Sequence, residues 1–334
     1  MSEQPAPRVL CFGEALVDRL GPLEDRLGGA PANVACALAR LGTPVAFLGR
    51  LGDDAIGAAF AALFAERGVD TRALQLDPIR PSRIVLVRRD SCGERSFGGF
   101  SGERGQGFAD QAVDAGALAA DLDPLLAQAQ WLLVGTIPLA TAASAAALEM
   151  VVALAGERGI PLAVDVNWRP TFWGLAAEAP PPPVALQRIR PLLERAALIK
   201  CAAEEAAALF GTADPLAIHG ELPQGPAVLI TDGGRPLRWC LAGSSGTLEA
   251  FSVPVVDTTG AGDAFTAGVL HGLCRRPELL SGDASDSGAA ADPGAVLDLL
   301  RFASACGALV CGGSGAIDPQ PTAAEVEAFL RQRP

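Results

Sequence analysis

Short apolar runs rich in β-forming residues alternate along the chain with longer segments in which apolar residues recur at helical spacing. The first part predicts a strand within 8–13, a helix over 34–41 that Gly42 ends, a strand over 44–52 and a helix over 53–67 that Gly68 ends. The same order continues with predicted strands at 131–139, 160–168, 196–201 and 226–232, and with predicted helices at 141–157 and 204–210. Strands that alternate with helices in this way predict an α/β fold, in which a mainly parallel sheet is covered by helices on both faces.

Residues 83–100 interrupt this order, because two β-prone runs there flank the turn-forming stretch "DSCG" and predict a hairpin. The stretch "GPLEDRLGGAPAN" after the first strand is predicted to be a loop. We expect the hairpin and this loop to form a small β appendage beside the main sheet. The prolines at 180–183 and the polar segment 281–294 predict two further loops that are exposed to solvent.

Half of the 334 residues are hydrophobic, which is enough to bury a large core. Asp and Glu number 38 against 26 Lys and Arg, and the formal net charge is −12. This balance disfavours nucleic acid as a partner, since proteins bind phosphate backbones chiefly through clustered Lys and Arg. A phosphate-bearing ligand would have to be bound by local backbone and side-chain groups.

The start of the chain, "MSEQPAPRVLCFGE", has neither the basic residues nor the apolar core of a signal peptide. The longest uncharged apolar stretch, 131–148, is interrupted by Gly135 and Pro138 and favours a soluble helix over a membrane span. We therefore expect a cytoplasmic protein with no membrane partner. The 8 cysteines form no Cys-x-x-Cys pair and the 2 histidines have no neighbour at a ligand spacing, so neither a disulfide framework nor a structural zinc site is predicted.

The stretch "DTTGAGDAFTAGVL" at 257–270 carries the clearest chemistry. A strand is predicted over 251–256 and a helix from about Ala261, whose apolar residues lie on one face. Gly260 and Gly262 would let a phosphate approach the backbone, where the first N–H groups and the dipole of the helix favour an anion. Asp263 could then accept a proton from an attacking hydroxyl, and its position would keep it ionised at neutral pH. It could equally be only a partner of the helix dipole, and these residues alone leave both interpretations open.

This motif resembles the C-terminal signature of the PfkB-type, ribokinase-like sugar kinases. Other segments resemble the same family in the same order along nearly the whole chain: "GEALVD", "GGAPANVACALARLG", "GRLGDDAIG", "VDVNWRPTFW", "IKCAAEEAAALFG", "LITDGG" and "FASACGALVCGGSGAI". The resemblance implies a single kinase domain over 1–334 with a Rossmann-like sheet, and a small β-sheet lid formed from about 12–30 and 83–110. It also implies transfer of a phosphoryl group from ATP to a primary hydroxyl of a small sugar.

Carried over position by position, the resemblance implies roles at the reacting end of the site. Asp263 would be the general base, and the anion hole for the transferring phosphoryl group would be formed by Gly260, Ala261 and Gly262. Sugar hydroxyls would be bound by Asp18, Gly29 and Asn33, while Asn167 and Arg169 would lie between the sugar and the phosphates. Residues such as Asp18 and Asn33 are also common in turns and caps, and an exposed Arg often forms only a surface ion pair.

The resemblance assigns the nucleotide and the cations in the same way. The loop over the nucleotide phosphates would hold Thr231, Asp232 and Gly233, and Ser304 would lie near the adenine. Many members bind a monovalent cation at positions that correspond to Asp257 and Thr259, with help from backbone carbonyls near Gly315. ATP and Mg²⁺ are therefore the expected cofactors, with K⁺ as a further one.

One departure from the family concerns magnesium. Members often carry an Asn-x-x-Glu motif that organises water around Mg²⁺ and the phosphates, whereas "CAAEEA" has Ala202 in place of the Asn. Glu205 remains, and the resemblance assigns it to the cofactor site. We therefore expect the magnesium shell to be arranged differently in this protein.

The loop "GGAPAN" lacks the Lys that ribokinases tend to have in "GGKGAN", and it resembles fructokinases, as do "GERSFGGF" and "DVNWRPTFW". Fructose, phosphorylated on a primary hydroxyl, is the first expectation. A sugar acid such as 2-keto-3-deoxygluconate would need a positive group facing its carboxylate, which Arg88, Arg89 or Arg95 could supply. Ribose also stays open, because a few hydrogen bonds decide between polyols.

Functions of other classes find less support in the sequence. A serine hydrolase would need Gly-x-Ser-x-Gly, which "LAGSSGT" and "CGGSGAI" both miss, and a dinucleotide-dependent oxidoreductase would need Gly-x-Gly-x-x-Gly after the first strand, which "CFGEALVDRLG" does not supply. A sensor that binds sugar or nucleotide without catalysis stays open, although Asp263 and both glycines favour an enzyme. The exposed strand edges of the lid would allow two copies to pair as a homodimer.

Overall fold

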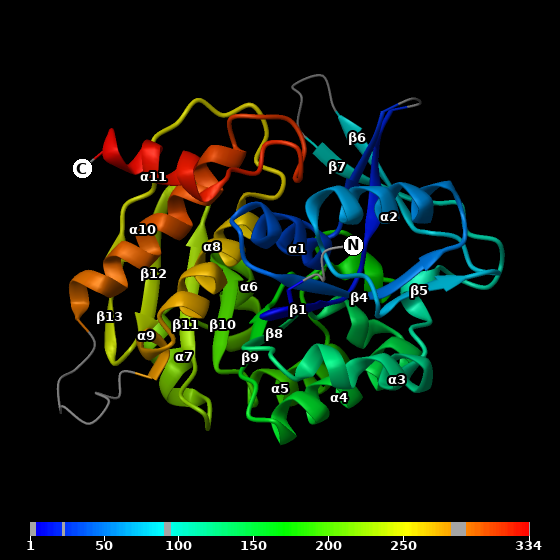
Figure 1. Cartoon of the computed structure of the whole chain (residues 1–334), viewed down its shortest axis with the longest axis horizontal. Coiled ribbons are helices and arrows are strands. Elements are labelled where there is room, and N and C mark those ends of the chain that lie inside the picture. Colours follow the sequence, from blue (N-terminus) through cyan, green and yellow to red (C-terminus); the bar gives the residue numbers. More distant parts are fainter. Residues whose placement is uncertain (1–4, 22–23, 90–94, 282–291, 334) are drawn as a thin grey trace.

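The computed structural model describes residues 5–21, 24–89, 95–281 and 292–333, so the stretch "DSCG" and most of the predicted loop at 281–294 lie outside this part of the chain. Figure 1 shows one large sheet flanked by helices and a smaller sheet beside it. Within the described residues the large sheet has the order β13-β12-β11-β10-β9-β8-β1-β4-β5. In that order the strands are Ser244–Leu248, Arg235–Leu241, Ala227–Asp232, Leu198–Ala202, Leu162–Asp165, Trp131–Val134, Val9–Phe12, Val45–Gly52 and Leu74–Asp77.

The order and direction of the strands indicate where a ligand would bind at the carboxyl ends of this sheet. The strands from β11 to β5 run parallel, and only β12 and β13 are antiparallel additions. Strand β1 pairs with β4 on one side and with β8 on the other, so the chain order reverses there. In open α/β sheets ligands bind beyond the carboxyl ends of the strands near such a reversal, and this is where the candidate site lies.

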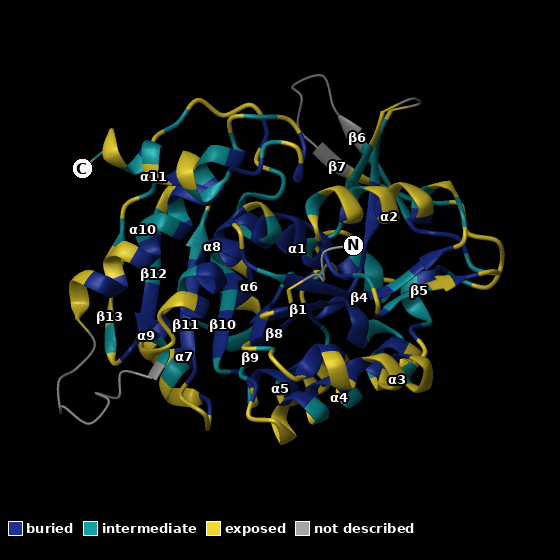
Figure 2. Cartoon of the chain, in the orientation of Figure 1, coloured by how far each residue is buried: buried dark blue, intermediate teal, exposed yellow. Residues whose placement is uncertain are grey.

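Helices bury an apolar layer on each face of the sheet, as Figure 2 shows. One face carries α1 (Ala30–Arg40), α2 (Ala55–Arg67), α8 (Ala261–Arg275), α10 (Pro293–Val310) and α11 (Ala323–Arg331). The other carries α3 (Ala115–Leu126), α4 (Ala142–Glu157), α5 (Pro183–Leu193), α6 (Ala203–Phe210) and α7 (Pro215–Glu221). Shorter helical segments are η1 (Ala109–Gln111), η2 (Ile137–Ala140), η3 (Pro170–Trp173) and α9 (Glu278–Ser281). The predicted α/β fold is confirmed.

The smaller sheet has the order β3-β2-β6-β7, with strands Asp25–Gly28, Leu16–Leu20, Ile84–Arg89 and Arg95–Ser101. Arg83, at its base, is buried and donates to the carboxylate of Asp110 at 2.8 and 3.0 Å. The same guanidinium lies 4.4–4.6 Å from the ring centroids of Phe100, Phe108 and Phe172. Because both charges are paired and the cation is enclosed by aromatic faces, this contact anchors the smaller sheet to the main domain.

Several segments differ from the sequence prediction, and the strand predicted over 131–139 ends at Val134, before η2. Residues 25–28, predicted to be a loop, form β3 because their backbone pairs with β2. Residues 251–256, predicted to be a strand, are irregular: the hairpin β12–β13 occupies the sheet edge, and Pro254 has no N–H to donate to a neighbouring strand. Val255 and Val256 are exposed instead, and the amide of Val256 donates to the carbonyl of Cys311 at 2.8 Å.

Helix α10 is the one helix of the described residues that is long and apolar enough to cross a membrane, with a mean hydropathy of 1.4 over 18 residues. Half of it is buried, and it packs along α8 in the core. Packing against α8 therefore accounts for its apolar face. The stretch 131–148 contains β8, η2 and the first turns of α4.

Helices α8 and α10 cross closely at Gly268, where a Cβ would lie 2.7 Å from the Cα of Ala303. We expect Gly268→Ala to lower the free energy of unfolding by about 1–3 kcal/mol, because overpacking outweighs the better helix propensity of Ala. Gly220→Ala in α7 is the matched control, since nothing lies within 4 Å of the added methyl group. The midpoint of urea denaturation should be lower in Gly268→Ala than in the unmodified protein, and it should not be lowered in Gly220→Ala. An unchanged midpoint in Gly268→Ala would contradict the tight crossing of α8 and α10.

Candidate active site

Helix α8 begins at the carboxyl edge of the main sheet, with Gly260 as its N-cap. Gly260 has φ 79°, in the left-handed region, and a Cβ there would lie 2.6 Å from the Cβ of Ala316. A larger residue would be strained and would also collide with the loop that follows α10. This glycine therefore sets how closely the first turn of α8 approaches that loop and where its amides point.

The backbone amides of this turn were predicted to form an anion hole. Among the hydrogen bonds of the described residues, the amide of Ala261 donates to the carbonyl of Thr258 at 3.2 Å. No such bond has the amide of Gly260 or Gly262 as its donor. These two amides can therefore face an anion at the positive end of the helix dipole, whereas Ala261 is committed to the turn.

Asp263 lies in the first turn of α8, and its Oδ2 accepts a hydrogen bond of 2.7 Å from Nδ2 of Asn33 in α1. Burial and then the charge of Asp165 raise the pKa of Asp263 to about 6, although Lys200, Asn33 and Arg169 oppose this rise. This pKa is higher than a helix N-terminus alone would produce, because desolvation disfavours the charged form. Most of the carboxylate is still ionised at neutral pH, and a base with a pKa near the working pH is well suited to proton transfer.

A cavity of about 500 Å³, here called the acceptor cleft, lies between the smaller sheet and the edge of the main sheet. Asp263 lines it together with every residue predicted to bind the sugar: Asp18, Gly29, Asn33, Asn167 and Arg169. Asp18 comes from β2, and Gly29 is the N-cap of α1 with φ 102°. Val85 and Phe97 of the smaller sheet line the same cavity, so this sheet forms one wall of the acceptor cleft.

The loop after β9 carries Asn167 and Arg169. Asn167 has φ 42°, a conformation that is uncommon for residues with side chains and that is enriched at functional sites. Glu205 holds this loop, since its Oε1 accepts from the amide of Trp168 and its Oε2 from the amide of Ala202, both at 2.8 Å. Arg169 lies 3.7 Å from the same carboxylate. Glu205 lines the acceptor cleft, and its assignment to the cofactor, through water around Mg²⁺, stays a prediction.

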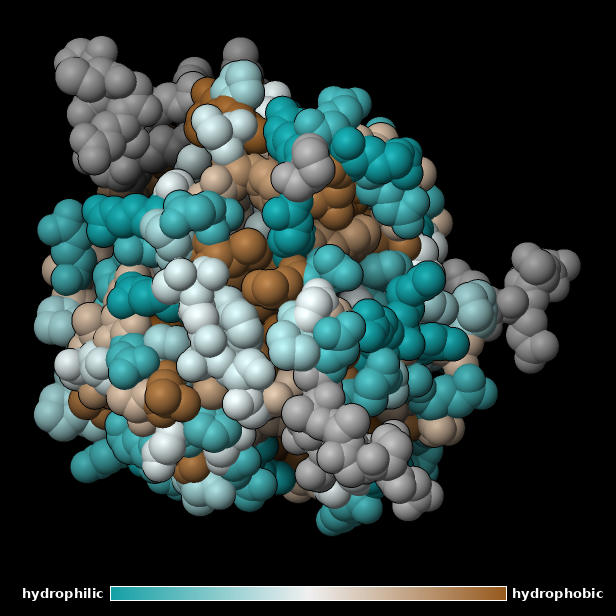
Figure 3. Space-filling model, turned by 90° about the vertical axis from the view of Figure 1, so that its left-hand side faces the viewer, coloured by the Kyte–Doolittle hydropathy of each residue, from teal (hydrophilic) through white to brown (hydrophobic). Residues whose placement is uncertain are grey.

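A second cavity, of about 560 Å³ and here called the nucleotide cavity, adjoins the first, and Thr258 and Gly262 line both. The residues predicted to contact the nucleotide all line it: Thr231, Asp232, Gly233 and Ser304. Much of its remaining wall is apolar and includes Leu237, Leu248, Phe251, Val253 and Val255. Figure 3 faces the side of the molecule that carries β13 and α10, where apolar surface lies among polar groups. An apolar slot beside a glycine loop suits a base and its phosphates.

Asp257 brings together the residues predicted to bind a monovalent cation. Its Oδ1 accepts from the amide of Thr259 at 3.0 Å and from the hydroxyl of Thr259 at 2.7 Å. Its Oδ2 accepts from the amide of Gly315 at 2.9 Å. The carboxylate therefore ties the turn before α8 to the loop after α10. No group of three or more His, Cys, Asp or Glu side chains in the described ranges is arranged to hold a metal ion.

Sequence reasoning missed Glu14, a residue of the acceptor cleft that follows β1. Its Oε1 accepts from the amide of Ala30 at 3.2 Å, and its Oε2 has no hydrogen-bond partner among the described residues. Burial raises the pKa of Glu14 to about 8, so the carboxyl is largely protonated at neutral pH. A protonated carboxyl in this cleft could donate a hydrogen bond to a sugar oxygen. The stretch "GEALVD" contains no signal that Glu14 would be buried.

Sequence reasoning also missed a buried ion pair between neighbouring strands. Nζ of Lys200 in β10 donates to both oxygens of Asp165 in β9, at 3.1 and 3.2 Å. Asp165 also accepts from the hydroxyl of Thr266 in α8 at 2.9 Å. A charge inside the apolar run "ALIKC" was the available signal, because charged residues are rarely buried unless they are paired.

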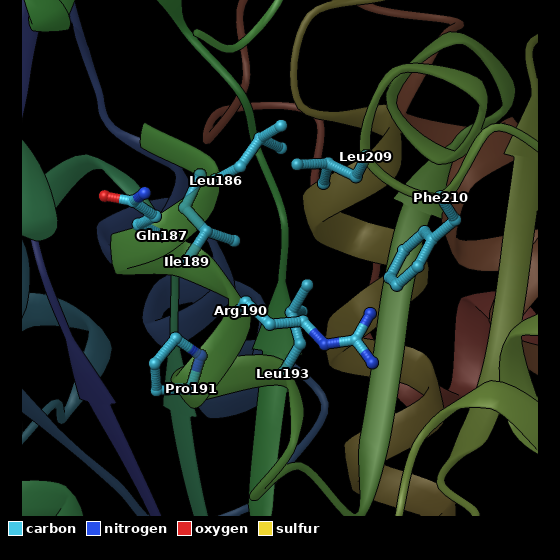
Figure 4. A pocket seen from close by; sticks show the side chains of 8 residues that line it. All are labelled: Leu186, Gln187, Ile189, Arg190, Pro191, Leu193, Leu209 and Phe210. Atoms are coloured by element: carbon cyan, nitrogen blue, oxygen red, sulfur yellow. The ribbon is translucent and has the colours of Figure 1, made fainter. Parts of the chain in front are cut away.

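A third hollow, of about 390 Å³, lies between α5 and α6 on the opposite helical layer from α8. Figure 4 shows Leu186 and Leu193 of α5 near Leu209 and Phe210 of α6, with the side chain of Arg190 extending between them. Arg190 is engaged by Glu194 at 2.8 Å and also by Glu221. This hollow brings together no base, nucleophile or anion hole, so the chemistry is assigned to the two cavities at α8.

Comparison with known proteins agrees with this geometry. Residues 7–323 match the pfkB family carbohydrate kinase. The chain is similar to a probable chloroplastic fructokinase-6 of Arabidopsis thaliana, with 33% identity over 99% of this chain and 84% of that protein. It is similar to the solved structure of a fructokinase from Xylella fastidiosa with bound ATP, with a TM-score of 0.83, 31% identity and coverage of 97% and 98% of the two chains.

A second solved structure is a double mutant of the fructokinase of Vibrio cholerae O395 in its fructose-, ADP- and potassium-bound form. Its TM-score is 0.79, with 27% identity over 98% of this chain and 99% of that one. The family match spans nearly the whole chain and confirms the resemblance inferred from the sequence motifs. The chain belongs to the pfkB family of carbohydrate kinases, phosphotransferases that act on a sugar hydroxyl.

Proposed function

We propose that this kinase transfers the γ-phosphoryl group of ATP to a primary hydroxyl of fructose. The observation that carries the proposal is the position of Asp263, which lines the acceptor cleft beside Gly262, a residue shared with the nucleotide cavity. A sugar hydroxyl at the carboxylate and a phosphate at the glycine amides would meet at this point. Such an arrangement suits phosphoryl transfer, in which positioning and charge stabilisation supply most of the catalysis.

In the proposed reaction Asp263 takes the proton of the sugar hydroxyl as its oxygen attacks the γ-phosphorus. A P–O bond to the sugar forms while the bond from the γ-phosphorus to the bridging oxygen breaks, and that electron pair leaves with ADP. The amides of Gly260 and Gly262 bind the negative charge of the transferring group. Asn33 holds the carboxylate through its 2.7 Å hydrogen bond.

The residues present fit the expected cations to different degrees. Mg²⁺ would neutralise phosphate charge. Glu205, whose two carboxylate oxygens each accept a backbone amide, would act on it through water, as the resemblance to the family implies. For K⁺ we propose Asp257, Thr259 and backbone near Gly315, which offer oxygen ligands of the kind that hard cations prefer. The potassium ion in the similar Vibrio structure supports this proposal.

Fructose is proposed as the acceptor because the similar proteins are fructokinases and the "GGAPAN" loop lies in the cleft. Asp18, Asn33 and the backbone at Gly29 offer hydrogen-bonding groups of the kind that polyols need. The cations that line the cleft within the described residues, Lys200 and Arg169, both face carboxylates. The side chains of Arg88, Arg89 and Arg95 lie outside the described part, so a sugar acid is tested as an alternative acceptor.

We further propose that the sheet β3-β2-β6-β7 acts as a lid over the acceptor cleft and excludes water that would otherwise hydrolyse ATP.

Strands β3 and β7 are the outer strands of this sheet. Pairing of two such edges would give a homodimer. The compartment that we propose is the cytoplasm.

The proposed function is tested by ADP release with MgATP against fructose, ribose, 2-keto-3-deoxygluconate, glucose and adenosine, each with and without potassium. We expect turnover on fructose and stimulation by potassium. Turnover on another acceptor alone would overturn the choice of sugar and keep the kinase class. No turnover on any acceptor would favour a sensor that binds its ligands without catalysis.

Replacement of the proposed base is expected to abolish most of the chemistry. Asp263→Asn should lower kcat by about 10²- to 10⁴-fold, because the amide cannot accept the hydroxyl proton. Sugar binding should survive, since the amide oxygen of the variant can still accept from Asn33. Steady-state kinetics and calorimetric titration with fructose measure the two effects; a nearly normal kcat would contradict the assignment of the base.

The raised pKa of Asp263, about 6, predicts the pH dependence of the reaction. kcat/KM should fall as the pH drops through about 6, because the protonated carboxyl cannot act as a base. Asn33→Ala removes a hydrogen bond to the charged form and should move this acid limb to higher pH. A pH profile that stays flat down to the usual range of Asp would contradict a buried base.

A further inference from the structure

Lys200 is the only lysine of this chain, and the other 25 of its 26 basic residues are arginines. It belongs to β10 in the middle of the main sheet, and its side chain is only 11% exposed. An ammonium is compact, whereas a guanidinium is a wide planar fork. A chain that uses Arg everywhere else therefore has the smaller cation at one buried position. Lys200 has no role in the reaction proposed so far.

Strand register holds the ammonium in place. Lys200 and Asp165 are partners in the parallel pair β10–β9, so their side chains emerge on the same face. Asp165 is the last residue of β9, and Lys200 is the third of the five residues of β10. Nζ donates to both carboxylate oxygens, at 3.1 and 3.2 Å. Since Thr266 of α8 donates to the same carboxylate at 2.9 Å, the ammonium is also fixed relative to the first turn of α8.

The ammonium lies beside Gly262, whose amide is proposed to be part of the anion hole. A Cβ built on Gly262 would be 2.9 Å from Nζ of Lys200, so a glycine at this position makes room for the cation. Lys200 lines the acceptor cleft together with Gly262 and Asp263. The amide that would complete the anion hole, that of Ala261, is committed to the carbonyl of Thr258, which leaves the hole short of one donor.

The charges around this point call for a fixed cation. The carboxylates of Asp165, Glu205 and Asp263 all act on Lys200, and an incoming γ-phosphate adds further negative charge. The other described cation of the cleft, Arg169, is a poor match because 55% of its side chain is exposed. Among the described residues that line the cleft, Lys200 is the one buried cation.

We propose that the ammonium of Lys200 supplies fixed positive charge to the phosphoryl-transfer site, where it stabilises the transferring group beside the Gly262 amide and favours the ionised form of Asp263. This inference rests on the proposed kinase function and adds the group that offsets the carboxylates around the reacting atoms. Asp165 is a positioning residue, since it aims Nζ. Burial opposes the charged amine, but Asp165, Glu205 and Asp263 outweigh it and raise the pKa of Lys200, so the amine stays protonated at neutral pH.

The first test removes the charge and keeps the apolar stem. Lys200→Met should lower kcat at least about tenfold, and by up to about 10²- to 10³-fold as for loss of an oxyanion-hole donor. KM for the sugar should stay within about threefold, because the charge acts on the reacting group and not on sugar binding. The acid limb of kcat/KM should move to higher pH, since Asp263 would face Asp165 with only Asn33 of α1 and Arg169 of the loop after β9 to oppose it.

A second pair of variants separates this role from a structural one. Lys200→Met leaves Asp165 buried without its partner, whereas the double variant Asp165→Asn/Lys200→Met removes both charges of this ion pair. We expect the double variant to regain much of the lost denaturation midpoint while kcat stays low. Lys200→Arg should retain more kcat than Lys200→Met, because it keeps the charge. A kcat equal to that of the unmodified protein in either Met-containing variant overturns the proposal.

The single lysine also permits a test that needs no turnover. Protein labelled with ¹³C,¹⁵N-lysine has one lysine side chain to observe by NMR. We expect its signal to move more with MgADP plus aluminium fluoride, which mimics the transferring phosphoryl group, than with MgADP alone. The proposal is overturned if aluminium fluoride does not change the Lys200 signal beyond the effect of MgADP alone. It is also overturned if the amine of Lys200 titrates near neutral pH.

The two hypotheses fail in distinguishable ways. If the unmodified protein turns over none of the sugars, the proposed function is wrong whatever the variants show. If it turns over a sugar while Lys200→Met has the same kcat and the same acid limb, the kinase function stands and the role of Lys200 is refuted.

Discussion

The carboxylate of Asp165 joins the three elements on which the site depends. It ends β9, accepts Nζ of Lys200 from β10 and accepts the hydroxyl of Thr266 from α8. A buried charge is costly unless it is paired and hydrogen-bonded, so this contact tolerates little displacement. The first turn of α8 cannot slide along the sheet without breaking it. Gly262 and Asp263 lie on that turn, and their place relative to both cavities follows from this carboxylate.

A second constraint acts on the same turn from the opposite side. Asp257 binds Thr259 before the helix and Gly315 after α10, while Gly260 packs against Ala316. The amides that face an anion are thereby held between the sheet and the last loop. The cage of phenylalanines around Arg83 anchors the smaller sheet in the same way. Short polar contacts thus fix the start of α8. The buried cation Arg83 fixes the smaller sheet, which forms one wall of the acceptor cleft.

In the proposed function, the two cavities bind their ligands through different physical forces. The acceptor cleft is lined by carboxylates, amides and backbone groups that can bind hydroxyls, whereas much of the nucleotide cavity is apolar. They share Thr258 and Gly262, so a sugar and a nucleotide bound as proposed would meet at the start of α8. The carboxylates that are proposed to bind a sugar would also repel a phosphate. The reaction therefore needs the glycine amides, bound cations and, in our proposal, the ammonium of Lys200.

The sequence by itself determined the alternation of strands and helices, because the spacing of apolar residues acts through local geometry. It also determined that "DTTGAGDAF" begins a helix with glycines, for the same reason. It also placed Asp263 in the first turn of a helix, and in the structure this residue lines the acceptor cleft. Only the tertiary structure decided what surrounds each group. The bond between Asn33 and Asp263 joins residues 230 positions apart, and the raised pKa of Asp263 depends on burial and on Asp165. The pairing of Asp165 with Lys200 and the irregular backbone at 251–256 depend on which strands become neighbours, and no local pattern of residues contains that information.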